Sequence, residues 1–98
     1  VSVGADWCLT CHYNNAAVFK NPAFTRNLAD KQVEIINVDW TNYDSETLRF
    51  MEKYGRSGLP FYIIFSPLIP EGMVLSEILN EPELSRLINN ITTYQPRP

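Results

Sequence analysis

The chain contains only two cysteines, Cys8 and Cys11, and two residues separate them. A thiolate is the nucleophile in disulfide exchange, and a second thiol three positions along can attack the mixed disulfide and release the product. The pair follows a strand-like segment at residues 1–3 and precedes a helical segment. The thiols are therefore expected at the start of a helix, where unpaired N–H groups and the helix dipole stabilise an anion. This spacing predicts a redox pair with Cys8 as the exposed attacking thiol and Cys11 as the more buried resolving thiol.

The cysteines have two alternative structural uses. A zinc site would require two further ligands, and His12 is the only histidine in the chain, so no metal is expected. A static disulfide in a non-catalytic interaction domain is the other alternative, and the spacing alone leaves it open.

The segment Cys8-Leu9-Thr10-Cys11-His12 also matches the pattern for attachment of a c-type haem. His12 would then be the proximal iron ligand, and Met51 or Met73 could be the sixth ligand. Small haem domains are usually helical, whereas this sequence predicts at least three strands, and both methionines are interpreted more simply as core residues. The redox pair is the preferred interpretation, and it needs no organic cofactor because the electrons reside in the cysteines themselves. A haem-carrying electron-transfer module remains the alternative.

A second candidate element, Gly58-Leu59-Pro60, precedes the most strand-like segment of the chain, residues 61–65. A proline at the start of a central strand removes one donor from the sheet, and a cis Leu59–Pro60 bond would turn the chain and expose the Leu59 backbone. Beside a thiol pair, that backbone could pair with an extended segment of a substrate protein. An ordinary trans proline at a strand edge is the alternative. Trp7, directly before the first cysteine, is predicted to offer a flat contact surface, with simple packing as the alternative.

Turn-forming residues and hydrophobic periodicity divide the chain into strands and helices. Strands are predicted at residues 1–3, 33–38, 61–65 and 73–78, and helices at residues 10–19, 23–28, 45–54 and 81–91. Asp44 is predicted to cap the third helix and Gly55 to end it. Pro67, Pro70 and Gly72 mark a loop between the last two strands. Trp40 is expected in the core or capping the end of a strand.

The predicted order β-α-β-α-β-β-α defines an α/β fold with a mixed central sheet and helices on both faces. A helical crossover joins the first two strands, so they should be parallel, and the last two should form an antiparallel hairpin. One domain is predicted at residues 1–92, followed by a frayed tail at residues 93–98.

The composition excludes several classes of function. The 98 residues carry 8 Lys+Arg and 11 Asp+Glu, and the net charge of −3 gives no basic surface for nucleic acid. The longest apolar stretch, residues 59–69, is too short for a membrane span, which needs about 20 apolar residues. The sequence opens directly into a strand-like segment without a start methionine, so we expect it to be part of a longer protein.

Three segments of the sequence, taken in order, resemble a known family. They are Ala5-Asp6-Trp7-Cys8-Leu9-Thr10-Cys11, Val38-Asp39-Trp40-Thr41 and Tyr54-Gly55-Arg56-Ser57-Gly58-Leu59-Pro60. The resemblance is to the thioredoxin-like C-terminal domain of the thiol:disulfide interchange protein DsbD family, and it extends to about Ile91. It implies a minimal thioredoxin-like fold in which Cys8 attacks, Cys11 resolves and Pro60 is a cis proline facing them.

The same resemblance implies a role in the cell. Such a domain is monomeric, lies on the periplasmic face and belongs to an inner-membrane protein. It takes electrons from the transmembrane part of its parent protein and passes them to the N-terminal periplasmic domain, which reduces disulfide isomerases and cytochrome c maturation factors. The predicted activity is that of a protein-disulfide reductase, acting on other proteins through transient mixed disulfides. A non-catalytic thioredoxin-fold interaction domain is the remaining alternative.

The sequence departs from the family pattern at three places. The first strand and helix of a full thioredoxin fold have no counterpart here. Ser2 and Asn15 stand where relatives carry acids that raise the thiol pKa values and shuttle protons. We therefore expect the pKa of Cys8 to be less elevated than in relatives that keep both acids.

Overall fold

The computed structural model describes residues 1–91, which form four strands, four α-helices and one π-helical segment. The elements along the chain are β1 (Ser2–Gly4), α1 (Leu9–Asn14), η1 (Asn15–Phe19), α2 (Pro22–Asp30), β2 (Asn37–Asp39), α3 (Ser45–Glu52), β3 (Phe61–Ser66), β4 (Ile69–Val74) and α4 (Glu81–Ile91). The domain boundary predicted at residue 92 and the frayed tail predicted at 93–98 lie outside the described residues.

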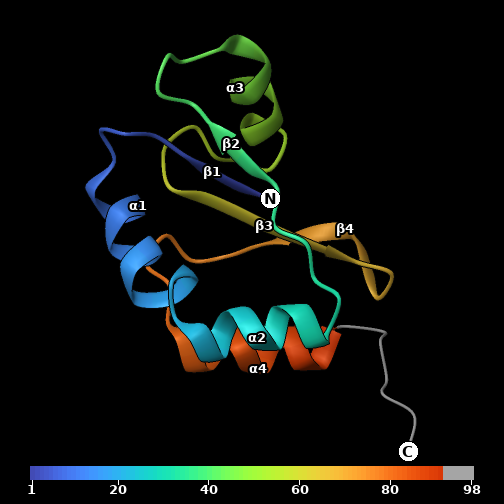
Figure 1. Cartoon of the computed structure of the whole chain (residues 1–98). Helices are drawn as coiled ribbons and strands as arrows, with labels where there is room; N and C mark the ends of the chain where they lie inside the picture. Colours follow the sequence, from blue (N-terminus) through green and yellow to red (C-terminus); the bar gives the residue numbers. More distant parts are fainter. Residues whose placement is uncertain (92–98) are drawn as a thin grey trace, which may run out of the picture.

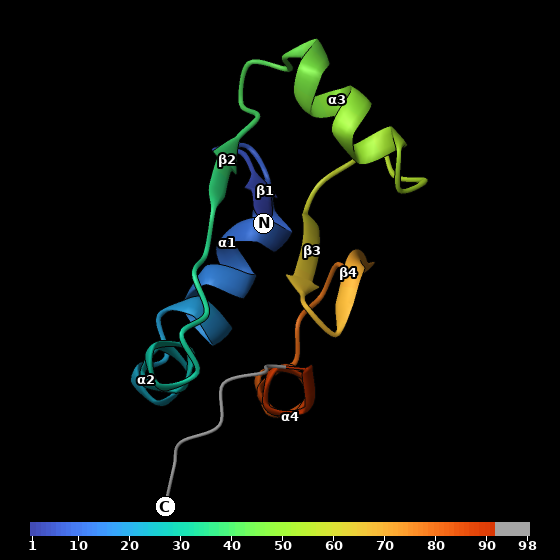
Figure 2. The ribbon, with the colours of Figure 1, turned by 90° about the vertical axis from the view of Figure 1, so that its right-hand side faces the viewer.

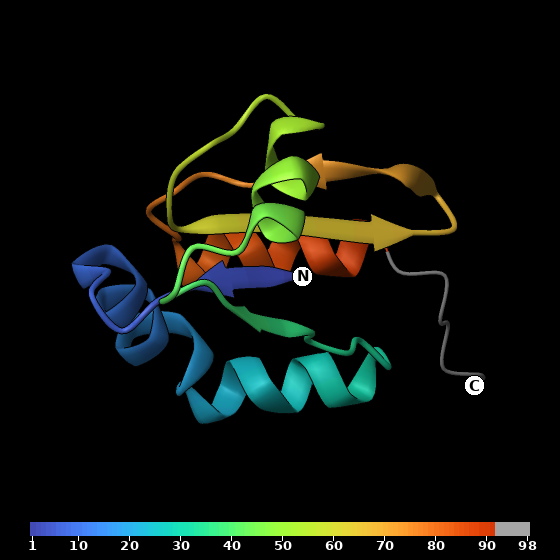
Figure 3. The same cartoon turned by 90° about the horizontal axis from the view of Figure 1, so that it is seen from above.

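The four strands form one mixed sheet in the order β2-β1-β3-β4. β1 pairs in parallel with β2 and antiparallel with β3, and β3 pairs antiparallel with β4. The predicted parallel first pair, antiparallel hairpin and mixed sheet are therefore confirmed. Figure 3 shows α1 near one end of the sheet and the β3–β4 turn at the opposite end.

Helices cover both faces of the sheet, as predicted. Figures 1 and 2 show α3 on one face and α2 and α4 side by side on the other. The residues of β3 alternate between these faces: Phe61 and Ile63 join the cluster under α3, whereas Tyr62 and Ile64 pack with the helices of the opposite face. Because successive side chains of a strand point to opposite faces, this one apolar strand connects the two cores.

The third and fourth predicted helices have the expected ends and apolar faces. Asp44 caps α3 by accepting a hydrogen bond from the Thr47 backbone N–H, and Gly55 adopts a φ of +78° shortly after the helix ends. A left-handed conformation of this kind favours glycine, which explains why the chain turns there. The apolar face of α4 contains the buried side chains of Leu84, Ile88 and Ile91.

The last predicted strand is wrong in position, because the hairpin turns earlier than expected. Pro67 does mark the turn, but β4 begins at Ile69 and includes Pro70 and Gly72, which the sequence placed in a loop. β4 is an edge strand, where the missing N–H of a proline is tolerated. At Gly72 the φ is +89° and a Cβ would lie 2.7 Å from the Phe65 ring, so glycine lets the strand pass close to its neighbour.

The second predicted strand, residues 33–38, is also shorter and more exposed than expected. Only Asn37–Asp39 forms β2, because its partner β1 is itself three residues long. Ile36 is exposed, whereas Val33 and Ile35 are partly buried against the core of the face that carries α2 and α4. The β-branched run therefore serves mainly as an approach to the sheet.

The first helix starts one residue earlier than predicted and changes its winding. It begins at Leu9 and continues as the π-helical η1 up to Phe19, and α2 then starts at Pro22 behind an Asn21 cap. The predictions for buried residues are partly confirmed. Trp40 and Met51 are buried, but Met73 is more than a third exposed on the edge strand, so its assignment to the core is wrong.

Candidate active site

Cys8 and Cys11 are joined by a disulfide bond at the start of α1, with 5.2 Å between their Cα atoms. Cys8 is the N-cap residue of the helix, and its Sγ accepts a hydrogen bond from the Cys11 backbone N–H at 3.1 Å. A thiolate at Cys8 would have the same donor within reach, and such a donor stabilises the anion. The predicted position at the start of a helix is confirmed.

The predicted difference in exposure between the two cysteines is wrong for the disulfide form. Each side chain is 6% exposed. In the disulfide form Cys8 is therefore as buried as Cys11. The neighbouring Leu9, by contrast, is 84% exposed.

The Leu59–Pro60 peptide bond is cis. Of the two alternatives that the sequence left open, the cis bond next to a thiol pair is therefore the correct one. Pro60 is buried, and the half-buried Leu59 side chain packs against the cluster under α3. The Leu59 side chain therefore belongs to the core, and only its backbone remains a candidate for contact with a partner.

The pairing of β1 with β3 places this proline near the disulfide. Val3 pairs with Phe61 in antiparallel register, so the next residue along β1, Gly4, lies opposite Pro60. A Cβ on Gly4 would lie 3.6 Å from the Sγ of Cys11. The sheet thus brings the proline segment, Gly4 and the resolving cysteine to one end of the fold.

Trp7 lies beside the disulfide in an aromatic arrangement. Its side chain is 46% exposed and stacks on Tyr43, with 5.3 Å between ring centroids and 14° between ring planes. The Trp7 indole Nε1 donates a hydrogen bond to the Thr41 backbone carbonyl at 3.2 Å. Tyr43 in turn meets the buried Trp40 edge to face at 5.0 Å. One face of Trp7 is therefore covered by a residue to which the sequence assigned no role.

A polar cavity of about 230 Å³ lies beside Cys11. Ser2 and Asn15, which replace the acids of the resembled family, both line it. Two acidic residues from other positions, Asp6 and Asp39, line the same cavity. Acidic residues therefore lie beside this cavity although neither Ser2 nor Asn15 is acidic.

Two groups in the wall of this cavity make hydrogen bonds to nearby residues. The side-chain hydroxyl and the backbone N–H of Thr41 both donate to the Asp39 carboxylate, and they hold the pKa of that carboxyl below its ordinary value. The ring nitrogen Nε2 of His12 lies 2.8 Å from the Asp6 backbone carbonyl. Because a carbonyl only accepts, Nε2 carries a proton in this arrangement.

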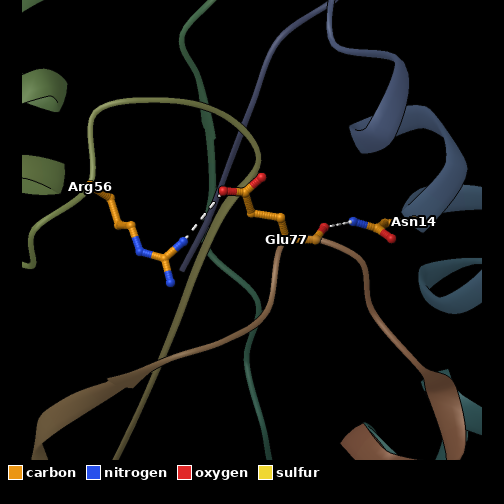
Figure 4. Close-up of polar contacts among 3 residues, drawn as sticks. All are labelled: Asn14, Arg56 and Glu77. Carbon is orange, nitrogen blue, oxygen red and sulfur yellow. Dashed lines mark hydrogen bonds and ion pairs between the residues drawn. The ribbon is translucent and has the colours of Figure 1, made fainter.

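Asn14 is fully buried one turn after Cys11 and connects three segments of the chain. Its Nδ2 donates to the Tyr62 hydroxyl and to the Glu77 backbone carbonyl, each at 2.8 Å, and its Oδ1 accepts from the Leu79 backbone N–H at 3.1 Å. Figure 4 shows Glu77 between Asn14 and Arg56, whose guanidinium lies 3.5 Å from the Glu77 carboxylate. The helix that carries the cysteines is thus bonded to β3 and to the loop between β4 and α4.

Comparison with known proteins identifies the family. Residues 1–67 match the family described as thioredoxin-like. The chain belongs to the thioredoxin-like family. This thioredoxin-like domain also superimposes on the crystal structures of the Neisseria meningitidis DsbD C-terminal domain in its reduced and oxidised forms. Each match has a TM-score of 0.69 and 17% sequence identity, and covers 92% of this chain and 76% of the other. No curated protein sequence matches.

These findings confirm the predicted thioredoxin-like fold, and the likeness to DsbD at this identity concerns the fold alone. A thioredoxin-like domain with a disulfide between closely spaced cysteines supports thiol-disulfide exchange. Within residues 1–91, no three histidine, cysteine or acidic side chains are grouped in a way that could hold a metal ion. No helix in the same part of the chain is long and apolar enough to cross a membrane.

Two residues of the site were missed by the sequence analysis. Asn14 follows Cys11 by three positions and precedes the buried Val18 by four, so its place on the buried face of the helix could have been found from helical spacing. Tyr43 gives no such signal, because its contact with Trp7 joins segments 36 positions apart and depends on the turn after β2.

Proposed function

We propose that this thioredoxin-like domain is a thiol-disulfide oxidoreductase that reduces disulfide bonds of other proteins through the Cys8–Cys11 pair. The observation that carries the proposal is the position of Cys8 as the helix N-cap, where its sulfur accepts the Cys11 backbone N–H. A donor fixed at this sulfur favours the thiolate over the thiol, and the thiolate is the attacking species.

The reaction uses the two thiols of the reduced domain. The Cys8 thiolate attacks one sulfur of the substrate disulfide and releases the other substrate sulfur as a thiolate, which takes up a proton. The Cys11 thiol loses its proton and attacks Cys8 in the mixed disulfide, which restores the intramolecular bond and releases the second substrate thiol. Two electrons and two protons pass from the domain to the substrate, and no cofactor takes part.

The other site residues have supporting roles in this proposal. The exposed part of Trp7 and the Leu59 backbone before the cis Pro60 contact the substrate segment while its sulfur is bonded to Cys8. Asp6 lines the cavity beside Cys11 and is a candidate to receive the proton that Cys11 loses. Asp39 also lines this cavity, but its lowered pKa makes it the weaker proton acceptor.

A more specific role follows from the resemblance to the DsbD C-terminal domain, supported by the likeness in fold. We propose that the domain acts on the periplasmic face as part of a membrane protein, where it accepts electrons from a membrane-embedded carrier and passes them to a second periplasmic domain. This electron relay would serve the reduction of disulfide isomerases and cytochrome c maturation factors.

The exchange mechanism is tested with two cysteine variants and an insulin-reduction assay. Cys8→Ser should abolish reduction and form no covalent complex with a substrate, whereas Cys11→Ser should accumulate the mixed disulfide at Cys8, detectable by mass spectrometry. If the cysteines form a static disulfide or attach a haem, the wild-type protein should not reduce insulin. Equal activity of the wild type and both variants would overturn the mechanism. The redox potential of the pair, measured against glutathione, then tests the direction, because a reductase requires a potential below that of its substrates.

A further inference from the structure

Three aromatic side chains form a continuous surface beside the disulfide, which we call the aromatic ledge. It consists of Trp7, Tyr43 and Trp40. Trp40 is the buried end, fixed by a hydrogen bond from its Nε1 to the Asp44 backbone carbonyl at 2.8 Å. Tyr43 is the middle ring, contacts both tryptophans and is 62% exposed, and Trp7, the residue before Cys8, is the other end. The ledge therefore reaches from the core to the residue that precedes the attacking cysteine.

Tyr43 holds its exposed position in an unfavourable backbone conformation. Its φ is +58°, in the left-handed region, and its backbone N–H donates to the Trp40 carbonyl at 3.1 Å. For a non-glycine residue this conformation costs on the order of 1 kcal/mol, and the contacts of the ring with Trp7 and Trp40 offset that cost while they leave the ring largely exposed. An exposed aromatic ring kept in place in this way is available to a ligand.

The segments that build the ledge are acidic. Residues 1–19 and 36–48 contain four acidic residues and no lysine or arginine. The acids are Asp6, Asp39, Asp44 and Glu46. The Asp44 carboxylate accepts hydrogen bonds from the backbone N–H and the side-chain hydroxyl of Thr47, which lower its pKa as those from Thr41 lower the pKa of Asp39. Both carboxyl groups are therefore ionised at neutral pH, and they lie on either side of Tyr43 in the sequence.

We infer that the aromatic ledge binds a substrate segment that carries a cationic side chain, arginine above all, close to its reactive cysteine. The inference rests on the exchange function proposed above, because it places the substrate sulfur at Cys8. A guanidinium can stack flat on an aromatic ring and at the same time be attracted by nearby carboxylates. Tyr43, which is 62% exposed, supplies the ring, and Asp39 and Asp44, which flank it in the sequence, supply the charge.

The test uses the reduced protein and short peptides whose single cysteine is joined by a disulfide to 2-mercaptoethanol. The peptides differ only two residues from the cysteine, where they carry arginine, glutamine or glutamate. At low ionic strength the arginine peptide should react about tenfold faster than the glutamate peptide, and added salt should reduce this preference. Bis(2-hydroxyethyl) disulfide is the small control substrate. It has no peptide segment, so its rate reports the reactivity of the cysteine pair alone.

Tyr43→Asn removes the ring with a residue that tolerates the left-handed conformation. It should slow the arginine peptide by about two- to fivefold, the size expected for one exposed cation–π contact, and leave the rate with the small disulfide unchanged. Tyr43→Phe should keep the wild-type rate. Leu68→Asn, which removes an exposed apolar side chain at the β3–β4 turn far from the disulfide, is the control and should change neither rate.

Three results would overturn the inference in different ways. A wild-type rate of Tyr43→Asn with the arginine peptide would show that the ring does not bind the substrate. An equal loss with the peptide and with the small disulfide would show that Tyr43 acts on the cysteine pair. A wild-type protein that exchanges with neither substrate would remove the exchange function itself, and this outcome is visible before any variant is made.

Discussion

The two faces of the sheet are packed in different ways. Under α3 the cluster is closed: Val3 and Met51 are fully buried, and aromatic rings of Phe61 and Phe50 meet edge to face at 6.0 Å. The face that carries α2 and α4 has a cluster of its own but also an open apolar cavity of about 400 Å³, bordered by residues 31–36. Both faces bury an apolar cluster, and the face with α2 and α4 also leaves space between its elements.

The difference matters because the cysteine helix continues into η1, whose Val18 belongs to the cluster of the face that has the open cavity. There the position of α1 depends on Asn14, whose amide is bonded to Tyr62, Glu77 and Leu79. Hydrogen bonds to one buried amide are directional and fix a helix in a particular orientation, whereas apolar contacts tolerate some sliding. The stability of the protein should therefore be sensitive to different substitutions on the two faces. Under α3 it should depend on the volume of the side chain, and behind the disulfide on its polarity.

The largest expected effect is the loss of the buried amide. Asn14→Leu keeps a similar volume but leaves the Leu79 N–H and the Glu77 carbonyl without their partner, so the free energy of unfolding should fall by about 3 kcal/mol. Urea denaturation measures the change. Asn89→Leu, at an exposed position of α4, is the matched control and should stay within about 0.5 kcal/mol of wild type. A loss below about 1 kcal/mol in Asn14→Leu would mean that packing, not the amide, holds α1.

A matched pair of valines compares the packing of the two faces directly. Val3→Ala, in the closed cluster, should lower the free energy of unfolding by about 2 kcal/mol, because no neighbour can fill the space. Val33→Ala, at the border of the open cavity, should cost about 0.5–1 kcal/mol, since this side chain is only partly buried. Both values come from urea denaturation, and equal losses would contradict the difference between the faces.

The sequence was sufficient for those parts of the fold that depend on local pattern. The position of the cysteine pair at the start of a helix, the Asp44 cap and the strand before Ser66 are encoded by neighbouring residues, and each was predicted correctly. The strand at residues 33–38 was not, because its length is set by β1, more than thirty residues away. Tyr43 was missed for the same physical reason, because its ring becomes part of the site only when the turn after β2 brings it into contact with Trp7.

A smaller effect is expected from the titration of Tyr62, whose hydroxyl accepts a hydrogen bond from Asn14. Burial raises the pKa of Tyr62 above its ordinary value, and the hydrogen bond from Asn14 opposes this only partly. Above pH ~10 the unfolded chain loses the phenol proton while the folded chain still holds it, so stability should fall as the pH rises towards the folded pKa. Tyr62→Phe should remove that alkaline loss and cost about 1 kcal/mol at neutral pH. Urea denaturation at neutral and alkaline pH tests both, and an unchanged alkaline slope would show that Tyr62 is not its source.

The smallest expected effect concerns the ion pair between Arg56 and Glu77, the residue whose backbone carbonyl Asn14 binds. The Arg56 and Glu77 side chains are 41% and 60% exposed, so solvent and salt screen their attraction. A double-mutant cycle with Arg56→Gln and Glu77→Gln should give a coupling of about 0.5 kcal/mol or less, and the coupling should disappear in high salt. Asn14 bonds the Glu77 backbone and not its carboxylate, so the loop keeps its inner attachment in both variants. A coupling above about 1 kcal/mol would mean that the exposed ion pair, as well as the buried amide, orders the loop behind the disulfide.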